Sequence, residues 1–404
     1  MARFLMTPHA PGGLLAHLAA CLAVADGLRE RGHEAIFAYG GTLPALIERA
    51  GFEWRPVIEA RGPMHWEWFH DADELDSMIS SHLALIEELR PAACVASAGL
   101  SRLATEVAGI PHMALLHSLA GTRYGAPKIR GWMLRDAARH PTRLLGHLSS
   151  WRSRRQGSEI AASIAEVRRR RGLPALSAPS NLMAGADLVA CATAPFLDPA
   201  RPLPAHYHYA GPLDYGAAAA TAIPCPGRAP RVYVSQGSTG SAKHLRRATA
   251  ALAAEGLEVV VTTGGLCDPA ELQELGPNVI ATAIADTRAE LEAADLAVIA
   301  GGNMTAMQAL VMGTPTVVLP RSSQQATGAL RAQRLGTGVA LWPFARRGSI
   351  ARAARRILRD PSFARRSAEL ATRLAAGWSG NRRVAELAER LAAPEAAGGS
   401  SPGG

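Results

Sequence analysis

The sequence is poor in lysine, in aromatic residues and in long apolar runs. Only Lys128 and Lys243 are lysines among 43 basic residues, and this use of arginine is typical of a GC-rich bacterial genome. No apolar stretch approaches the roughly 20 residues that a helix needs to cross a bilayer, so no membrane span is predicted. The apolar part of the N-terminus is too short for a signal peptide, and we expect a cytoplasmic protein.

The cysteines offer no metal site or disulfide framework. The five residues, Cys21, Cys94, Cys191, Cys225 and Cys267, are scattered along the chain. They show neither pairing nor the spacing of metal ligands, which is typical of reduced thiols in a cytoplasmic protein. The sequence therefore predicts no metal.

The net charge of +9 is concentrated between residues 128 and 171. Arginines alternate there with apolar residues such as Trp132 and Trp151, so the segment is amphipathic. It could contact an anionic membrane surface, but a solvated helical face is the preferred interpretation in a chain so rich in arginine. No nucleic-acid-binding motif accompanies the charge, so we expect no nucleic-acid partner.

Apolar strands alternate with helical patterns in two successive sets, which predicts an α/β fold. Between the sets, residues 210–230 are rich in proline, glycine and alanine and are typical of a linker. Two such sets predict two doubly wound, Rossmann-like domains facing an interdomain cleft. We predict an N-terminal domain at 1–212, a linker at 213–230, a C-terminal domain at 231–376, a C-terminal helix at 377–393 that packs back on the first domain, and a disordered tail at 394–404.

The most informative local pattern is Gly301-Gly302, which lies between the apolar run 296–300 and a stretch of helical spacing that begins at Asn303. This order predicts a strand, a tight loop and a helix. Glycines let the backbone approach a ligand, and the first amides of a helix point at it with the positive end of the dipole. The pattern suits a diphosphate, although many strand–helix turns carry glycine for geometry alone.

Two ordered signatures extend this pattern over most of the chain. The first is Gly12-Gly13, His17 and Arg31-Gly32-His33-Glu34; the second runs from Asp295 through Gly301-Gly302 and Thr305 to Gly313-Thr-Pro315, Gln325 and Gly338. Over roughly residues 1–393 the chain resembles the GT-B glycosyltransferases that use nucleotide sugars, in particular actinobacterial enzymes of the UDP-glycosyltransferase type that decorate natural products. The resemblance implies a UDP- or dTDP-sugar, a small-molecule acceptor, no other cofactor, and a monomer or homodimer.

His17 matches the position of the catalytic base in that family, at the start of the first helix and facing the cleft. A histidine with a pKa near neutrality suits removal of a proton from an attacking alcohol. Without the resemblance, a partly exposed structural histidine would be the default interpretation. His33 lies in a helix-to-strand turn, where the resemblance implies a structural role.

Family members often orient this histidine with an aspartate after the strand that here ends near Ser97. This chain has Ala98 at that place, so we expect His17 to work without a partner on that strand. Five acids are candidate substitutes: Glu67, Asp71, Asp73, Asp76 and Glu106.

The resemblance also assigns a donor site. Gln308 replaces the acid that usually holds the ribose, and its amide keeps a carbonyl acceptor. Gln308→Ala should therefore weaken diphosphate binding, whereas Gln308→Glu should retain or strengthen it. The expected donor contacts are Gly237, Ser238, Ile284, Gly301, Gly302, Asn303, Thr305, Gln308, Gln324 and Gln325.

An aromatic cluster at residues 64–70 stands out in a chain with 5% aromatic residues. In the resembling family this region lines the acceptor pocket, and aromatic walls suit a ring-rich acceptor. Packing of the cluster onto the domain explains it equally well. The expected acceptor contacts are His9, Trp66, Trp68, Phe69 and His117.

We predict an inverting glycosyltransferase that moves a sugar from a UDP- or dTDP-sugar to a natural-product acceptor. Three alternatives remain: a transferase that acts on a lipid-linked acceptor at a membrane, a non-catalytic partner protein with the same fold, and a sugar-nucleotide epimerase. The retention of His17 favours catalysis over the non-catalytic alternative.

Overall fold

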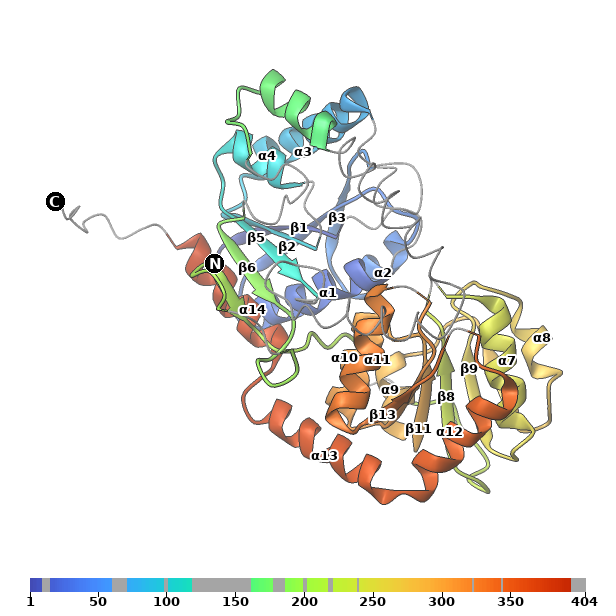
Figure 1. Ribbon diagram of the computed structural model, residues 1–404. Coiled ribbons are helices and arrows are strands. Elements are labelled where there is room, and N and C mark those ends of the chain that lie inside the picture. The colour runs from blue at the N-terminus through green and yellow to red at the C-terminus, as the bar shows by residue number, and fades with distance from the viewer. Residues whose placement is uncertain are drawn as a thin grey trace.

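The computed structural model describes residues 1–8, 15–59, 71–97, 101–117, 161–176, 186–198, 202–216, 221–237, 240–321, 323–342 and 344–393. These residues form two α/β units, each built on a sheet of parallel strands flanked by helices (Figure 1). The predicted fold class, two Rossmann-like domains, is confirmed.

The first sheet has the strand order β3-β2-β1-β4-β5-β6-β7, and every neighbouring pair is parallel. Its strands are β1 (Arg3–Thr7), β2 (Glu34–Tyr39), β3 (Glu53–Pro56), β4 (Ala93–Ala96), β5 (His112–Leu116), β6 (Leu188–Cys191) and β7 (Tyr207–Tyr209). The order reverses between β1 and β4. In open α/β sheets, ligands bind outside the carboxyl ends of the strands at such a reversal.

Helices cover the faces of this sheet and bury the apolar runs of its strands. They are α1 (Leu15–Glu30), α2 (Pro44–Arg49), α3 (Ala72–Leu89) and α4 (Ser101–Ala108), and residues 161–170 are also helical. Because α1 follows β1 and α4 follows β4, both helices begin at the edge where the strand order reverses.

The second sheet has the strand order β10-β9-β8-β11-β12-β13, again fully parallel. Its strands are β8 (Arg231–Ser235), β9 (Glu258–Thr262), β10 (Val279–Thr282), β11 (Leu296–Ile299), β12 (Thr316–Val318) and β13 (Gly338–Ala340). Here the order reverses between β8 and β11, so the loop after β11 lies at the second reversal point.

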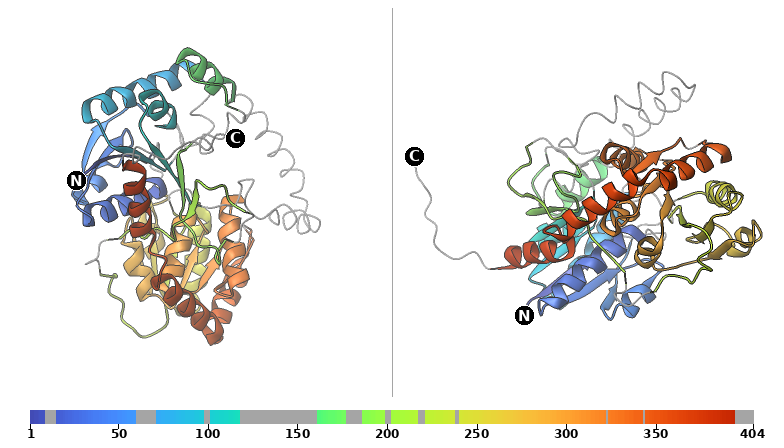
Figure 2. Two further views of the ribbon diagram at one scale, coloured as in Figure 1. Left: turned by 90° about the vertical axis from the view of Figure 1, so that its left-hand side faces the viewer. Right: turned by 90° about the horizontal axis from the view of Figure 1, so that it is seen from below.

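The helices of the second unit are α7 (Ala242–Ala253), α8 (Pro269–Gln273), α9 (Thr287–Ala293), α10 (Asn303–Met312), α11 (Ser323–Leu335), α12 (Arg347–Arg359) and α13 (Pro361–Ala375). The chain then returns to the first unit, where α14 (Gly380–Ala392) packs along α1 (Figure 2). His33 supports this packing, because its Nδ1 accepts from the Ala2 amide and its Nε2 lies 2.6 Å from Glu389. His33 therefore has the structural role that the resemblance implies.

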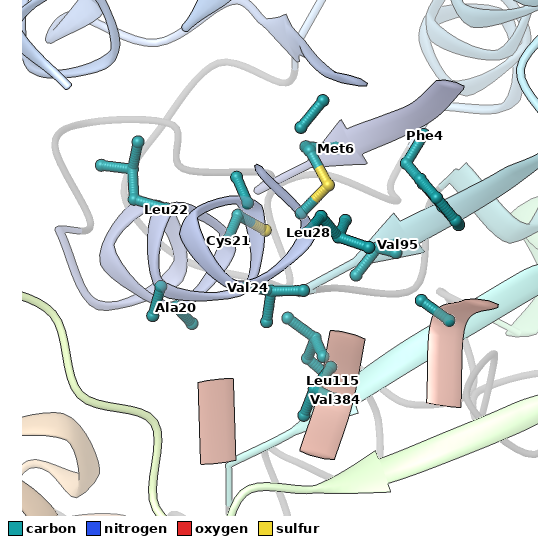
Figure 3. Close-up of a cluster of buried hydrophobic side chains, with 14 of the residues drawn as sticks. Phe4, Met6, Ala20, Cys21, Leu22, Val24, Leu28, Val95, Leu115 and Val384 are labelled. Atoms are coloured by element: carbon teal, nitrogen blue, oxygen red, sulfur yellow. The ribbon is translucent and has the colours of Figure 1, made fainter. Parts of the chain in front are cut away.

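The core of the first unit lies between the sheet, α1 and α14 (Figure 3). Phe4 and Met6 of β1 meet Leu22 of α1 and Val384 of α14 in one buried cluster. Met304 of α10 belongs to the same cluster. The start of α10 is thus pinned against the first unit, although α10 belongs to the second.

Part of the basic segment is neutralised within the first unit. The guanidinium of Arg168 is buried and bonds both oxygens of Glu106, at 2.7 and 2.8 Å. Arg170 and Arg171 pair with Asp73 and Asp76 of α3. These arginines connect the 161–171 stretch to α3 and α4, while residues 128–160 lie outside the described residues. Within the described part of the chain, no helix has the length and apolarity needed to span a bilayer.

Candidate functional site at the strand-order reversal

His17 lies in the first turn of α1 and is half-buried. Its Nδ1 is 2.9 Å from the backbone oxygen of Ser97 and 2.8 Å from the Ser97 hydroxyl. A carbonyl oxygen can only accept a hydrogen bond, so Nδ1 carries the proton and Nε2 carries the lone pair. This is the tautomer in which Nε2 acts as a base.

The expectation that His17 has no partner on the strand ending near Ser97 is wrong. Ser97 follows β4 directly, is fully buried, and has its amide bonded to the Thr7 carbonyl at the end of β1. The partner was missed because one of its two contacts is a backbone oxygen, which every residue type carries, and the other is a hydroxyl in place of the expected carboxylate. Ala98, the position considered in the sequence, lies outside the described residues.

The candidate acids that the structure describes are engaged elsewhere. Asp71 caps α3 by accepting from the Asp73 amide, and Asp73, Asp76 and Glu106 form the arginine pairs of the 161–171 stretch. Glu67 lies outside the described residues.

His117 follows β5 and also contacts Ser97. Its Nε2 is 2.8 Å from the Ser97 hydroxyl, and its ring meets that of His17 edge-on at a centroid distance of 5.2 Å. Burial lowers the pKa of His117 to about 4, so this ring is neutral at pH 7. The sequence placed His117 among the acceptor contacts, whereas its ring is directed at Ser97.

The three side chains can form one directional chain of hydrogen bonds. With His117 neutral, its Nε2 can accept from the Ser97 hydroxyl, and the Ser97 oxygens can accept from Nδ1 of His17. The arrangement fixes the imidazole ring of His17. It also gives the imidazolium, which forms when Nε2 gains a proton, two oxygen acceptors.

The expected donor residues that are described lie along the carboxyl edge of the second sheet. Gly237 follows β8, Ile284 follows β10 and is 65% exposed, and Gly301-Gly302 follow β11. Gly301 has φ of +87°, and a methyl group there would lie 2.6 Å from the carbonyl oxygen of Gln325. Only glycine fits this turn, which lets α11 pack against the start of α10.

The N-terminus of α10 can offer backbone amides to an anion. Gly302 is the N-cap residue and supplies no side-chain cap, and the space beside its Cα is open. Thr305 follows in the first turn and is half-buried. This geometry is compatible with the predicted diphosphate site.

The side chain of Asn303 connects the two units. Its Nδ2 donates to the backbone oxygen of His117, and its Oδ1 accepts from Arg331 at 3.2 Å. The resemblance implies that the backbone amide of Asn303 contacts the diphosphate. The side-chain bonds of Asn303 do not involve this amide, so the backbone contact stays a prediction.

Gln308 is buried and holds the segment after the first unit. Its Nε2 donates to the backbone oxygen of Tyr215 at 2.6 Å. Burial raises the pKa of Asp214, the residue before Tyr215. Gln325 is similarly engaged, with Oε1 accepting from the Arg321 amide at 2.8 Å. The ribose role of Gln308 stays a prediction, but this residue has a structural function as well.

Several expected contacts lie outside the described residues. They are His9, Trp66, Trp68, Phe69, Ser238 and the side chain of Gln324. The aromatic acceptor wall therefore stays a prediction.

Sequence reasoning missed three residues of this region besides Ser97. Arg331 and Asp198 form a nearly buried ion pair between the units. Gln236 follows β8, is 1% exposed, and has no hydrogen-bond partner for its amide among the described residues. The position of Ser97 after a reversal-point strand could have indicated it, but no local signal links Arg331 to a partner 133 residues away.

Two other observations lie away from this region. A hollow of about 450 Å³ is lined by residues that include Leu83, Arg90 and Pro91. Pro91 precedes β4, so the hollow lies at the opposite edge of the first sheet. Among the described residues no group of three or more histidine, cysteine or acidic side chains is arranged to hold a metal ion.

Comparison with known proteins shows what this architecture is similar to. No family model matches the chain. A solved glycotransferase of kitacinnamycin superposes with a TM-score of 0.76 and 21% identity, covering 97% of this chain and 99% of that one. A spinosyn rhamnosyltransferase complexed with thymidine diphosphate superposes with a TM-score of 0.65 and 21% identity, covering 97% and 100%.

The chain has the GT-B glycosyltransferase fold. The predicted resemblance to actinobacterial natural-product glycosyltransferases is confirmed, and the relatives and structural neighbours are glycosyltransferases, in agreement with the predicted enzyme class.

Two curated relatives with similar sequences extend the comparison. A "PGL/p-HBAD biosynthesis rhamnosyltransferase" of Mycobacterium tuberculosis is 25% identical over 346 residues, which is 81% of this chain and 74% of the relative. The "4'-demethylrebeccamycin synthase" of Lentzea aerocolonigenes is 34% identical over 224 residues, which is 52% of each. In this glycosyltransferase fold, His17 and the Gly301-Gly302 turn lie at the reversal points of the two sheets.

The contact of Gln308 with Tyr215 changes the result expected for Gln308→Glu. A glutamate would place a carboxylate oxygen against the Tyr215 carbonyl and beside Asp214, so it should lower the free energy of unfolding by about 1–3 kcal/mol. Gln308→Met keeps the volume without the charge and should cost less. Urea unfolding of the three proteins measures this. Equal stability of the glutamate variant and the wild type would show that Gln308 does not hold the linker.

The lowered pKa of His117 predicts a pH-dependent contribution to stability. Between its ordinary pKa of 6.5 and its folded value of about 4, the unfolded chain binds a proton that the folded chain does not, so this contribution falls as pH falls. Relative to His117→Gln, the wild type should therefore lose stability between pH 7 and pH 4.5. Urea unfolding at both pH values tests this, and the other buried histidines cancel in the difference. A constant difference would contradict a buried neutral His117.

Proposed function

We propose that this chain is an inverting glycosyltransferase that transfers a sugar from a dTDP- or UDP-sugar to a hydroxyl group of a natural-product acceptor. One observation carries the proposal: the Ser97 carbonyl holds His17 in the tautomer whose Nε2 can accept a proton. The base lies at the reversal point of one sheet, and the amides of α10 begin at the reversal point of the other. The relatives named above support the same reaction class and a thymidine diphosphate donor.

The residues of the chain suit the following single displacement. Nε2 of His17 takes the proton of the acceptor hydroxyl as its oxygen bonds to the anomeric carbon of the sugar. The bond between that carbon and the diphosphate breaks, and the nucleoside diphosphate leaves with the electron pair. Attack from the face opposite the leaving group inverts the anomeric configuration.

Two parts of the site stabilise the charges that develop. Positive charge forms on the imidazole of His17, whose Nδ1–H faces both oxygens of Ser97. Negative charge forms on the leaving diphosphate, which the amides of Gly302, Asn303 and Met304 at the start of α10 would face. Such preorganised dipoles favour the transition state because they need no rearrangement during the reaction.

Membrane association is not needed for this proposal. Arg168, Arg170 and Arg171 of the basic segment have acidic partners within the first unit, which leaves them less charge to offer a lipid surface. A soluble, ring-rich acceptor is therefore the proposed substrate class, with the acceptor contacts at His9, Trp66, Trp68 and Phe69 still predictions.

Replacement of His17 tests the proposed chemistry. His17→Ala should lower the turnover number about 10²- to 10⁴-fold, because a positioned general base is lost. Sugar transfer is measured by mass spectrometry with a panel of dTDP- and UDP-sugars and hydroxylated aromatic aglycones. Calorimetric titration with dTDP is the control and should give the same affinity for the variant and the wild type, since His17 lies on the acceptor side.

Three results would contradict the proposal in different ways. Normal turnover by His17→Ala would remove the base assignment. Absence of binding of dTDP and UDP to the folded wild type would remove the transferase function. Tight dTDP binding without transfer to any acceptor or hydrolysis of any donor would favour the non-catalytic alternative.

A further inference from the structure

The hydrogen bonds around His17 continue beyond His117 into the second unit. The backbone oxygen of His117 accepts from Asn303, the first residue of α10, while the ring of His117 bonds Ser97. His117 thus makes both contacts: its carbonyl bonds the second unit, and its ring bonds Ser97 next to His17. A shift of α10 relative to the first unit would move His117 and, through Ser97, the imidazole of His17.

The Asn303 amide has only one orientation that satisfies both neighbours. Arg331 can only donate, so the atom facing it is Oδ1, and the His117 carbonyl can only accept, so the atom facing it is Nδ2. An aspartate would match Arg331 but would turn an oxygen toward the His117 carbonyl. The amide therefore links the Arg331 guanidinium, which can only donate, to the His117 carbonyl, which can only accept.

Arg331 is itself held by the first unit. Its Nε lies 3.1 Å from Oδ1 of Asp198, and its Nη2 lies 2.6 Å from Oδ2. Both side chains are largely buried. Asp198 belongs to the turn after β6, and Arg334, one turn further along α11, donates to the Leu197 carbonyl in the same turn. The ion pair thus orients the guanidinium that orients Asn303.

We propose that Asn303 and Arg331 are positioning residues for His17: they couple the docking of the second domain to the orientation of the base through His117 and Ser97. The inference rests on the proposed glycosyl transfer. It adds a role for the Asn303 side chain to the contact with the diphosphate that is expected of its backbone amide. A positioning side chain sets the rate of the chemical step. The Ser97 carbonyl sets the tautomer of His17 within the first domain, and docking of the second domain adds the link through His117 and the Ser97 hydroxyl.

Asn303→Asp separates these roles. The variant keeps the oxygen that accepts from Arg331 and loses the N–H that donates to the His117 carbonyl. The turnover number should fall about 10- to 100-fold, because the base is then displaced by up to about 1 Å from its productive position. The new carboxylate stands at the start of α10, where the amides are proposed to face the diphosphate, so the donor KM should rise. The turnover number is therefore compared at saturating donor. Arg331→Lys, which keeps a cation for Asp198 but loses the planar fork, should reduce turnover in the same manner and by less.

Asn278→Asp is the matched control. Asn278 donates through Nδ2 to the carbonyls of Ala253 and Leu257, and it precedes β10 at the edge of the second sheet opposite the site. Asn278→Asp also places a carboxylate oxygen against these two backbone carbonyls, as Asn303→Asp does at His117. It should lower thermal stability but leave turnover per folded molecule unchanged.

A double variant of Ser97 and Asn303 distinguishes a positioning role of Asn303 from a purely structural one. If Asn303 acts through Ser97, the double variant Ser97→Ala/Asn303→Asp should turn over within about twofold of Ser97→Ala alone. Independent effects that multiply in the double variant would overturn the proposal. So would weaker dTDP binding by Asn303→Asp with an unchanged turnover number, which would make Asn303 a diphosphate ligand.

A second readout needs no substrate. Long-range proton–nitrogen NMR of histidine-labelled protein should show the His17 ring signals shifted in Asn303→Asp and unchanged in Asn278→Asp. Unchanged His17 signals in Asn303→Asp would overturn the coupling. Because this arm does not depend on turnover, absence of sugar transfer by the wild type would contradict the proposed function alone.

Discussion

The hydrogen bond from Nδ1 of His17 to the Ser97 carbonyl is the interaction on which the site depends. It selects one of two tautomers, and the selected one leaves the lone pair on Nε2. A carbonyl does this without a full negative charge, unlike a carboxylate. The base is therefore oriented as an aspartate would orient it, and the two oxygens of Ser97 stabilise the imidazolium through their dipoles.

The parallel sheets explain why these residues meet. His17 follows β1, Ser97 follows β4 and His117 follows β5, so all three stand at one edge of the first sheet, beside the strand-order reversal. Asn303 follows β11 at the corresponding edge of the second sheet. Met304 is buried in the core of the first unit and keeps the start of α10 against it, where Asn303 bonds the His117 carbonyl.

The sequence predicted the features that depend on residue type and on the period of apolar residues. Apolar runs and glycine turns located the two sheets, and the Gly301-Gly302 turn located the start of α10. It could not predict Ser97 as the partner of His17, because one of the two bonding atoms is a backbone oxygen. It assigned the backbone amide of Asn303 to a phosphate because helix N-termini bind anions. It did not predict the side-chain contact with Arg331, which becomes a neighbour only in the folded chain.

The most direct test of this account is the tautomeric state of His17 in the resting protein. Nitrogen-15 NMR of the histidine side chains at pH 8, with His17 assigned by its loss in His17→Ala, distinguishes protonated from unprotonated ring nitrogens. Nδ1 of His17 should carry the proton, and Nε2 should be unprotonated. A proton on Nε2 with an unprotonated Nδ1 would mean that Ser97 does not orient the base, and the account would be contradicted.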